Sequence, residues 1–159
     1  MSILSTKSLL VNDLVYYDKK SLNKISEKLN EEEVDNIQDF LIITQLQGPS
    51  TLQELYLSGN QIGNEGAIVI GKGLQTNMSL QKLSLYDNQI GDEGAIAISK
   101  GLQTNTSLQK LSLTENQIGN EGAIAIGKGL QINTSLQALS LDGNQIEYKG
   151  AIALSLIHI

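Results

Sequence analysis

The sequence predicts an α/β solenoid shaped as a partial horseshoe, with a parallel sheet on the concave face and helices on the convex face. Three observations predict this fold class. A block of 28 residues recurs, beginning at Thr51, Ser79, Ser107 and Ser135, and its second and third copies match at 23 of 28 positions. The first half of each block has the apolar period of a strand. The second half has nearly the apolar period of a helix.

The first half of each block predicts a short strand. In the second block, Leu80, Leu83 and Leu85 follow the pattern L-x-x-L-x-L, and the last two leucines flank Ser84. This alternation is typical of a strand that is buried on one face. We therefore expect strands near residues 54–57, 82–85, 110–113 and 138–141.

The second half of each block predicts a helix. In the second block, Ala95, Ile96, Ile98 and Leu102 have nearly helical spacing. A glutamate precedes this apolar stripe and a lysine lies near its end, which complements the helix dipole. We expect helices near residues 65–74, 93–102 and 121–130.

A single strand–helix pair cannot bury both its leucines and its isoleucines, so the blocks must stack on one another. Strands are narrower than helices, and the stack should therefore curve with the sheet inside. One asparagine recurs where each strand turns outward, and we expect its amide to bind backbone groups of the adjacent turn. These residues are Asn60, Asn88, Asn116 and Asn144. A recurring Gly–Ala pair, such as Gly94 with Ala95, is expected to let neighbouring helices approach closely.

The motif L-x-x-L-x-L-x-x-N-x-I-G-x-E-G-A, found over residues 50–154, resembles that of the ribonuclease-inhibitor-like class of leucine-rich repeats. That class includes ribonuclease inhibitor, Ran GTPase-activating protein and the sensor arrays of NOD-like receptors. The resemblance implies a leucine-rich-repeat solenoid. It implies no single function, because members share the scaffold and differ in partner. Unlike ribonuclease inhibitor, the chain has no cysteine, and no catalytic residue of the GTPase-activating members can be matched in it.

The repeats divide the chain into three parts. Residues 1–49 lie outside the repeat, and apolar residues at helical spacing predict a helical N-terminal segment that caps the first repeat. A segment of a larger upstream module is the alternative. Residues 50–153 hold three full repeats and one truncated repeat. Residues 154–159 match the translation of a transposon adapter, and we interpret them as a sequencing scar, with a natural short terminus as the alternative.

Composition disfavours several classes of function. The net charge is −6 and all 11 basic residues are lysines, which opposes a nucleic-acid partner. With no cysteine and one histidine, His158, we predict no catalytic residue, metal, cofactor or small-molecule substrate. Without a signal peptide or a long apolar stretch, we expect a cytoplasmic protein with no membrane partner. Three N-x-S/T sequons occupy one slot of the repeat and are interpreted as turn residues: Asn77, Asn105 and Asn133.

Differences between the blocks concentrate at strand positions that point away from the core, and just after them. We interpret these positions as a partner-binding surface on the concave face, with Tyr56 and Tyr86 as its aromatic anchor. Sequence drift on an exposed surface is the alternative explanation. The predicted surface comprises Glu54, Tyr56, Ser58, Lys82, Ser84, Tyr86, Asp87, Lys110, Ser112, Thr114, Glu115 and Asp142.

The leading functional hypothesis is therefore a module that binds a protein partner on the concave face and performs no chemistry of its own. A regulator of the Ran GTPase-activator type and an architectural spacer are the alternatives. A hydrolase that uses Asp87 and Glu115 is disfavoured, because like charges at one slot of a solenoid are usually solvated.

Overall fold

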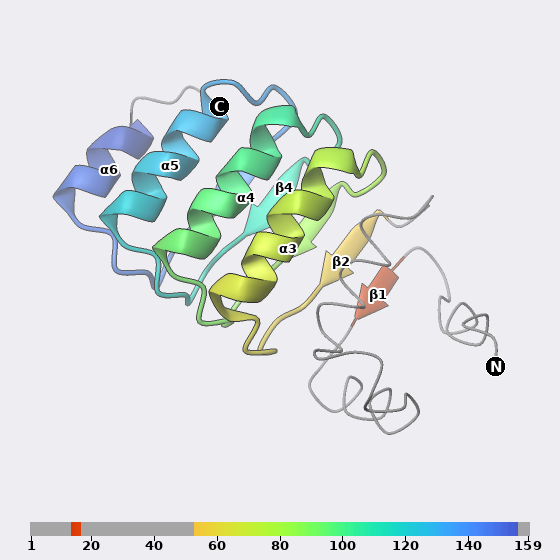
Figure 1. The fold of residues 1–159 in the computed structure, drawn as a ribbon, viewed down its shortest axis with the longest axis horizontal. Helices are drawn as coiled ribbons and strands as arrows, with labels where there is room; N and C mark the ends of the chain where they lie inside the picture. Colours follow the sequence, from red (N-terminus) through yellow and green to blue (C-terminus); the bar gives the residue numbers. More distant parts are fainter. Residues whose placement is uncertain (1–13, 17–52, 156–159) are drawn as a thin grey trace.

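The computed structural model describes residues 14–16 and 53–155, which form a parallel sheet with helices along one face (Figure 1). The elements, in chain order, are β1 (Leu14–Tyr16), β2 (Glu54–Tyr56), α3 (Gly63–Thr76), β3 (Lys82–Ser84), α4 (Asp92–Thr104), β4 (Lys110–Ser112), α5 (Asn120–Leu130), β5 (Ala138–Ser140) and α6 (Tyr148–Ser155). The five strands pair in chain order, and every pair is parallel. The predicted α/β solenoid is confirmed.

The register of the sheet follows the repeat. Leu55 pairs with Leu83, Leu83 with Leu111, and Leu111 with Leu139, so each strand pairs with residues 28 positions away. The strands are one residue shorter than predicted. The ladder nevertheless continues past each strand end, because Leu85 N donates to Ser112 O at 2.9 Å and Leu113 N donates to Ser140 O at 2.8 Å. Helices α3, α4 and α5 agree with the predicted ranges to within two residues at each end.

Strand β1 lies within residues 1–49, where only helices were predicted. It extends the sheet beyond the first repeat, with Leu14 opposite Glu54 and Tyr16 opposite Tyr56. The helical spacing noted at residues 22–29 and 34–41 lies outside the described residues.

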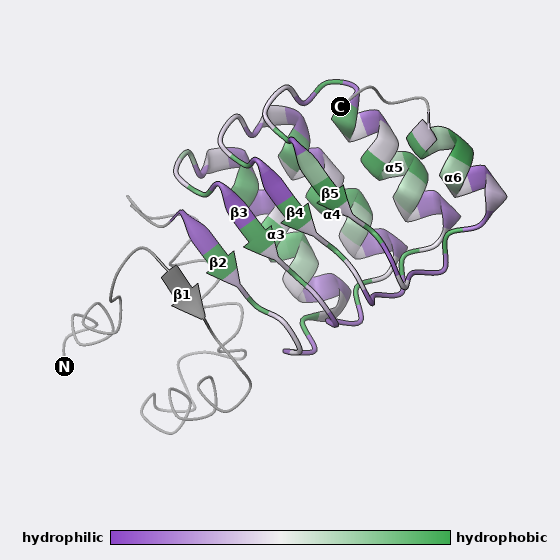
Figure 2. Ribbon diagram, turned by 180° about the vertical axis from the view of Figure 1, so that it is seen from behind, coloured by the Kyte–Doolittle hydropathy of each residue, from purple (hydrophilic) through white to green (hydrophobic). Residues whose placement is uncertain are grey.

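The helices pack against one face of the sheet, and the strands are visible from the other side (Figure 2). The core fills the space between the two layers. In the second repeat, Leu83 and Leu85 of the strand side and Ile98 and Leu102 of the helix side are at most 1% exposed. Side chains on either side of Leu83 in β3 are half-buried and point away from this core. We call the face of the sheet without helices the open face.

The recurring asparagines hold the turns of neighbouring repeats together, as predicted. Asn88 is fully buried, and its Oδ1 accepts hydrogen bonds from Asn60 N at 2.9 Å and Ile62 N at 3.4 Å. Its Nδ2 donates to Leu57 O at 2.8 Å and to Tyr86 O at 3.2 Å. One amide thus satisfies backbone groups that the strand-to-helix turn removes from water.

The sequon asparagines form a second row of this kind, at the turn between helix and strand. Asn105 is 2% exposed. Its Nδ2 donates to Leu74 O and Asn77 O, at 2.8 and 2.9 Å, and its Oδ1 accepts from Leu108 N at 2.8 Å. Asn133 repeats the arrangement one block later. The interpretation of these residues as turn residues is confirmed.

A third row of side chains caps each helix from the preceding repeat, and sequence reasoning missed it. Asp92, at the start of α4, accepts hydrogen bonds from Gly119 N at 2.7 Å and Gly122 N at 2.8 Å, at the start of α5. Asn64 does the same for the start of α4, and Asn120 for the start of α6. Two free N–H groups at the start of each of α4, α5 and α6 are therefore satisfied from the preceding repeat.

Glycines allow the helices to approach closely, as predicted for the Gly–Ala pairs. A Cβ at Gly94 would lie 2.7 Å from Ala67 Cβ. A Cβ at Gly101 would collide with the backbone oxygen of Gly71 in the neighbouring helix. None of the described helices is long and apolar enough to cross a membrane.

The fourth repeat is less buried than the others. Leu139 and Leu141 are partly buried where their counterparts in β3 and β4 are buried, and Ile152 is 42% exposed. Leu154 and Ser155 begin the segment interpreted as a sequencing scar, and they continue helix α6. Leu154 packs partly buried against the core.

Candidate functional site

The open face carries its side chains in rows that run across the strands. Parallel pairing in register places equivalent residues of successive repeats side by side. The row at the start of the strands, which we call the lysine edge, comprises Glu54, Lys82 and Lys110. The row at the end of the strands comprises Tyr56, Ser84, Ser112 and Ser140. The turns that follow carry Ser58, Tyr86, Asp87, Thr114, Glu115 and Asp142.

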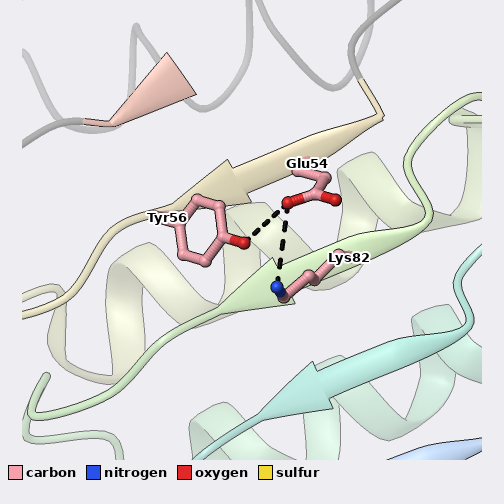
Figure 3. Close-up of polar contacts among 3 residues, drawn as sticks. All are labelled: Glu54, Tyr56 and Lys82. Carbon is pink, nitrogen blue, oxygen red and sulfur yellow. Dashed lines mark hydrogen bonds and ion pairs between the residues drawn. The ribbon is translucent and has the colours of Figure 1, made fainter. Parts of the chain in front are cut away.

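Three side chains at the first two repeats form a polar cluster (Figure 3). Tyr56 Oη donates a hydrogen bond of 2.6 Å to Glu54 Oε2. Lys82 Nζ lies 3.7 Å from the same carboxylate oxygen and 4.9 Å from the centroid of the Tyr56 ring. One ion pair and one cation–π contact join β2 to β3, and the hydrogen bond fixes Tyr56 against Glu54 within β2.

This cluster favours the protonated form of Lys82. The side chain of Tyr56, and after it the charge of Glu54, raise the pKa of Lys82 above its ordinary value. Both members of the ion pair remain about 40% exposed, so water screens their attraction. The cluster orients Tyr56 and Lys82 on the surface more than it stabilises the fold.

The middle of the open face is floored by small hydroxyl side chains. Ser58 Oγ and Ser84 Oγ lie 3.4 Å apart, and Ser112 Oγ donates to Thr114 Oγ1 at 3.4 Å. The backbone groups beneath them are already paired between strands. Between β2 and β5, a ligand would therefore meet polar side chains and not unpaired backbone.

Three carboxylates lie at the far side of this floor, in the turns after β3, β4 and β5. Asp87, Glu115 and Asp142 are all exposed, and we call them the acidic edge. Asp87 N donates to Thr114 O at 3.1 Å, and Glu115 N donates to Asp142 O at 2.8 Å, so the turns lie side by side. Among the described residues, no lysine forms an ion pair with any of the three.

The backbone conformation sets the direction of two of these side chains, Asp87 and Glu115. Asp87 and Glu115 have positive φ angles of 53° and 54°, in the left-handed region, which non-glycine residues rarely adopt. The equivalent positions in the first and fourth repeats are Gly59 and Gly143. The Glu115 carboxylate lies over Gly143, where a Cβ would come within 2.5 Å of Glu115 Cδ.

None of the twelve residues predicted to form the partner-binding surface is buried. Tyr86 is 44% exposed, and Tyr56 is half-buried against Glu54 and Lys82. The Tyr56 cluster was not predicted, because the sequence gives strand register but not side-chain rotamers. The sequence does hold one signal for this cluster. Glu54 and Lys82 have opposite charges at the same position of adjacent repeats, which predicts an ion pair across the strands.

Asp87 and Glu115 lie on an exposed rim of the open face. Within residues 14–16 and 53–155, no group of three acidic or histidine side chains is placed to hold a metal ion.

Comparisons with known proteins agree with this architecture. A family model described as leucine rich repeat matches residues 48–71, 76–99, 104–127 and 133–155. No curated protein matches the chain significantly. Among solved structures, actin-binding site 2 of leiomodin-1 is similar, with a TM-score of 0.67 and 22% identity, over 76% of this chain and 71% of that one. The C-terminal domain of Caenorhabditis elegans tropomodulin is similar, with a TM-score of 0.60 and 14% identity, over 74% of this chain and 89% of that one. Since the family model covers more than half of the sequence in four successive blocks, the chain belongs to the leucine-rich repeat family.

Proposed function

We propose that this chain is a protein-binding module whose partner docks on the open face of the sheet. One observation carries the proposal: the open face presents charged, hydroxyl and aromatic side chains on the strands of one parallel sheet. These positions differ between repeats, whereas the core positions are nearly constant. Rigid backbone limits the entropy that a binding surface loses when its partner docks.

The proposal includes a cytoplasmic location, membership of the ribonuclease-inhibitor-like class, and no chemistry of its own. The leiomodin-1 segment of similar fold is described as an actin-binding site. Actin is therefore the first purified partner to test. Regulation of a GTPase remains a special case of the same binding function.

Two double variants, one on the open face and one on the helix face, test the proposal. Tyr56→Ala with Tyr86→Ala removes both aromatic side chains from the open face. Truncating a central aromatic anchor costs about 2 kcal/mol of affinity or more. Because Tyr86 is exposed and Tyr56 is only half-buried, the same change should alter the free energy of unfolding by about 1 kcal/mol or less. We expect loss of partner capture with a nearly unchanged melting curve, measured by pull-down from extract with identification by mass spectrometry, and with purified actin in parallel.

The matched control is Lys72→Ala with Lys100→Ala, which changes two exposed side chains on the outer helices α3 and α4. This variant should retain every partner that the unaltered chain captures. Capture that is lost with the helix variant and kept with the tyrosine variant would place the binding site on the helix face. A chain that captures nothing specific in either form would favour the architectural spacer.

A further inference from the structure

The open face has opposite charges at its two edges. The acidic edge holds three carboxylates, Asp87, Glu115 and Asp142, with a charge of −3. The lysine edge holds Glu54, Lys82 and Lys110, so its net charge is −1 + 2 = +1. The two edges are separated by four to five residues along the chain, which spans at most about 13–16 Å, because the acidic edge lies in the turns beyond the strand ends.

Some charges at the two edges already form an ion pair within the chain, and others do not. Lys82 forms an ion pair with Glu54, and its Nζ lies 3.7 Å from Glu54 Oε2. Lys110 is exposed and forms no ion pair within the described residues. The three carboxylates lie on neighbouring turns and form no ion pair with the described lysines. A cationic ligand can therefore pair with them without displacing a lysine of this chain.

Tyr86 adds a second recognition element beside the acidic edge. It is 44% exposed and directly precedes Asp87. An exposed aromatic ring in the turn that carries Asp87 can accept a lysine or arginine side chain over its face. Along β3, β4 and the turn after β4, the hydroxyl floor between the edges consists of the small side chains of Ser84, Ser112 and Thr114.

We infer that the open face binds a protein segment of bipolar charge, with a basic cluster on the acidic edge and an acidic side chain near Lys110. This inference rests on the proposed function and names the chemistry of its partner. Two or three basic residues about 5 Å apart would match the spacing of the three turns. A nucleic acid does not fit this face, because its phosphates would lie against the three carboxylates.

Synthetic peptides of about 16 residues provide the probe. The bipolar peptide carries lysines in one half and glutamates in the other half, on an alanine background. The control peptide has the same composition with the two charges interleaved, and a short DNA duplex tests the other class of ligand. Fluorescence anisotropy at low salt measures each dissociation constant. We expect the bipolar peptide to bind about fivefold to tenfold more tightly than the interleaved one, since each exposed pair contributes roughly a factor of two.

A charge-matched pair of variants assigns this preference to the acidic edge. Asp87→Asn, Glu115→Gln and Asp142→Asn together remove three negative charges from the open face. Glu65→Gln, Glu93→Gln and Glu121→Gln remove three negative charges from exposed positions on the helices. The first variant should lose the preference for the bipolar peptide, and the second should keep it. The preference should also weaken as salt is added.

Three results would overturn the inference: equal binding of both peptides, equal effects of the two triple variants, or tighter binding of DNA than of the bipolar peptide. The proposed function fails separately. If the tyrosine variant abolishes partner capture while the acidic edge has no charge preference, the open face is still the binding site and only the charge assignment is wrong.

Discussion

Individual asparagines act as connectors between repeats, because each satisfies backbone groups 26 to 31 residues away. Asn116 accepts hydrogen bonds from Asn88 N and Ile90 N at 3.1 and 3.0 Å, and it donates to Leu85 O at 2.9 Å. Those backbone groups are buried and have no water to replace the amide. The row of asparagines therefore links the hydrogen bonding of one repeat to the folding of the next.

Replacement of Asn88 by alanine should destabilise the protein by about 3–5 kcal/mol, because it leaves several buried donors and acceptors without partners. Asn88 is fully buried and bonds to Asn60, Ile62, Leu57 and Tyr86. Urea unfolding followed by circular dichroism measures the change. Gln75→Ala, on the exposed side of α3, is the control and should stay within about 0.5 kcal/mol. A similar small effect for Asn88→Ala would contradict the connector role.

The sequence predicted this role at the residue scale because the asparagine falls at the end of every strand. It did not predict which backbone groups the amide reaches. A side chain in one repeat can bond to its own turn or to the turn before it, and only the stacking distance decides between them. Asn88 does both, through Tyr86 O and Asn60 N.

Helices α4, α5 and α6 each depend at their start on a side chain from the preceding helix. Asp92 belongs to α4, and its carboxylate bonds to two N–H groups at the start of α5. The N-cap residues of α4 and α5 are Gly91 and Gly119, which have no side chain that could cap the helix. A search for capping residues within one repeat therefore finds nothing, which explains why sequence reasoning missed this row.

Asp92→Ala should destabilise the protein by about 1–2 kcal/mol, the usual cost of losing a helix cap. Asp92→Asn should retain most of the stability, because Asn64 and Asn120 make the same two bonds in the neighbouring repeats. Thermal unfolding of the two variants compares them directly. If alanine and asparagine are equally destabilising, the carboxylate charge at the helix start matters more than the cap geometry.

At the scale of the whole molecule, each repeat contacts only its neighbours, so stability is shared along the stack. The second and third repeats are covered on both sides, and Leu83, Leu85 and Leu113 are at most 1% exposed. In the fourth repeat, the corresponding Leu139 and Leu141 are only partly buried. Local opening should therefore begin at the fourth repeat and proceed inward.

Hydrogen exchange measures this gradient. Backbone amides of β3, β4 and α4 should exchange most slowly, and those of β5 and α6 should exchange fastest, because less apolar surface is exposed when the fourth repeat opens. Mass spectrometry of peptic fragments resolves the repeats, since each differs from the others at several positions. Uniform protection across all repeats would mean that the array opens as a single unit.

The sequence by itself determined the repeat, the order of strand and helix, the core positions and the exposed rows of the open face. Period and spacing fix these features, because a strand with alternating leucines buries one face and a helical stripe buries the other. Identical blocks must also stack in register, so the alignment of Leu55, Leu83, Leu111 and Leu139 follows from the length of the block.

Only the tertiary structure decided how side chains reach across repeats. The hydrogen bond from Tyr56 to Glu54, the placement of Lys82 beside both, and the cap that Asp92 gives to α5 depend on distances set by stacking. Strand β1 likewise has no repeat signal, and it is recognised only because it pairs with β2. Local periodicity predicts which face of a strand or helix a residue occupies. The contacts between side chains of successive repeats depend on how the repeats pack, and the sequence of a single block does not show this.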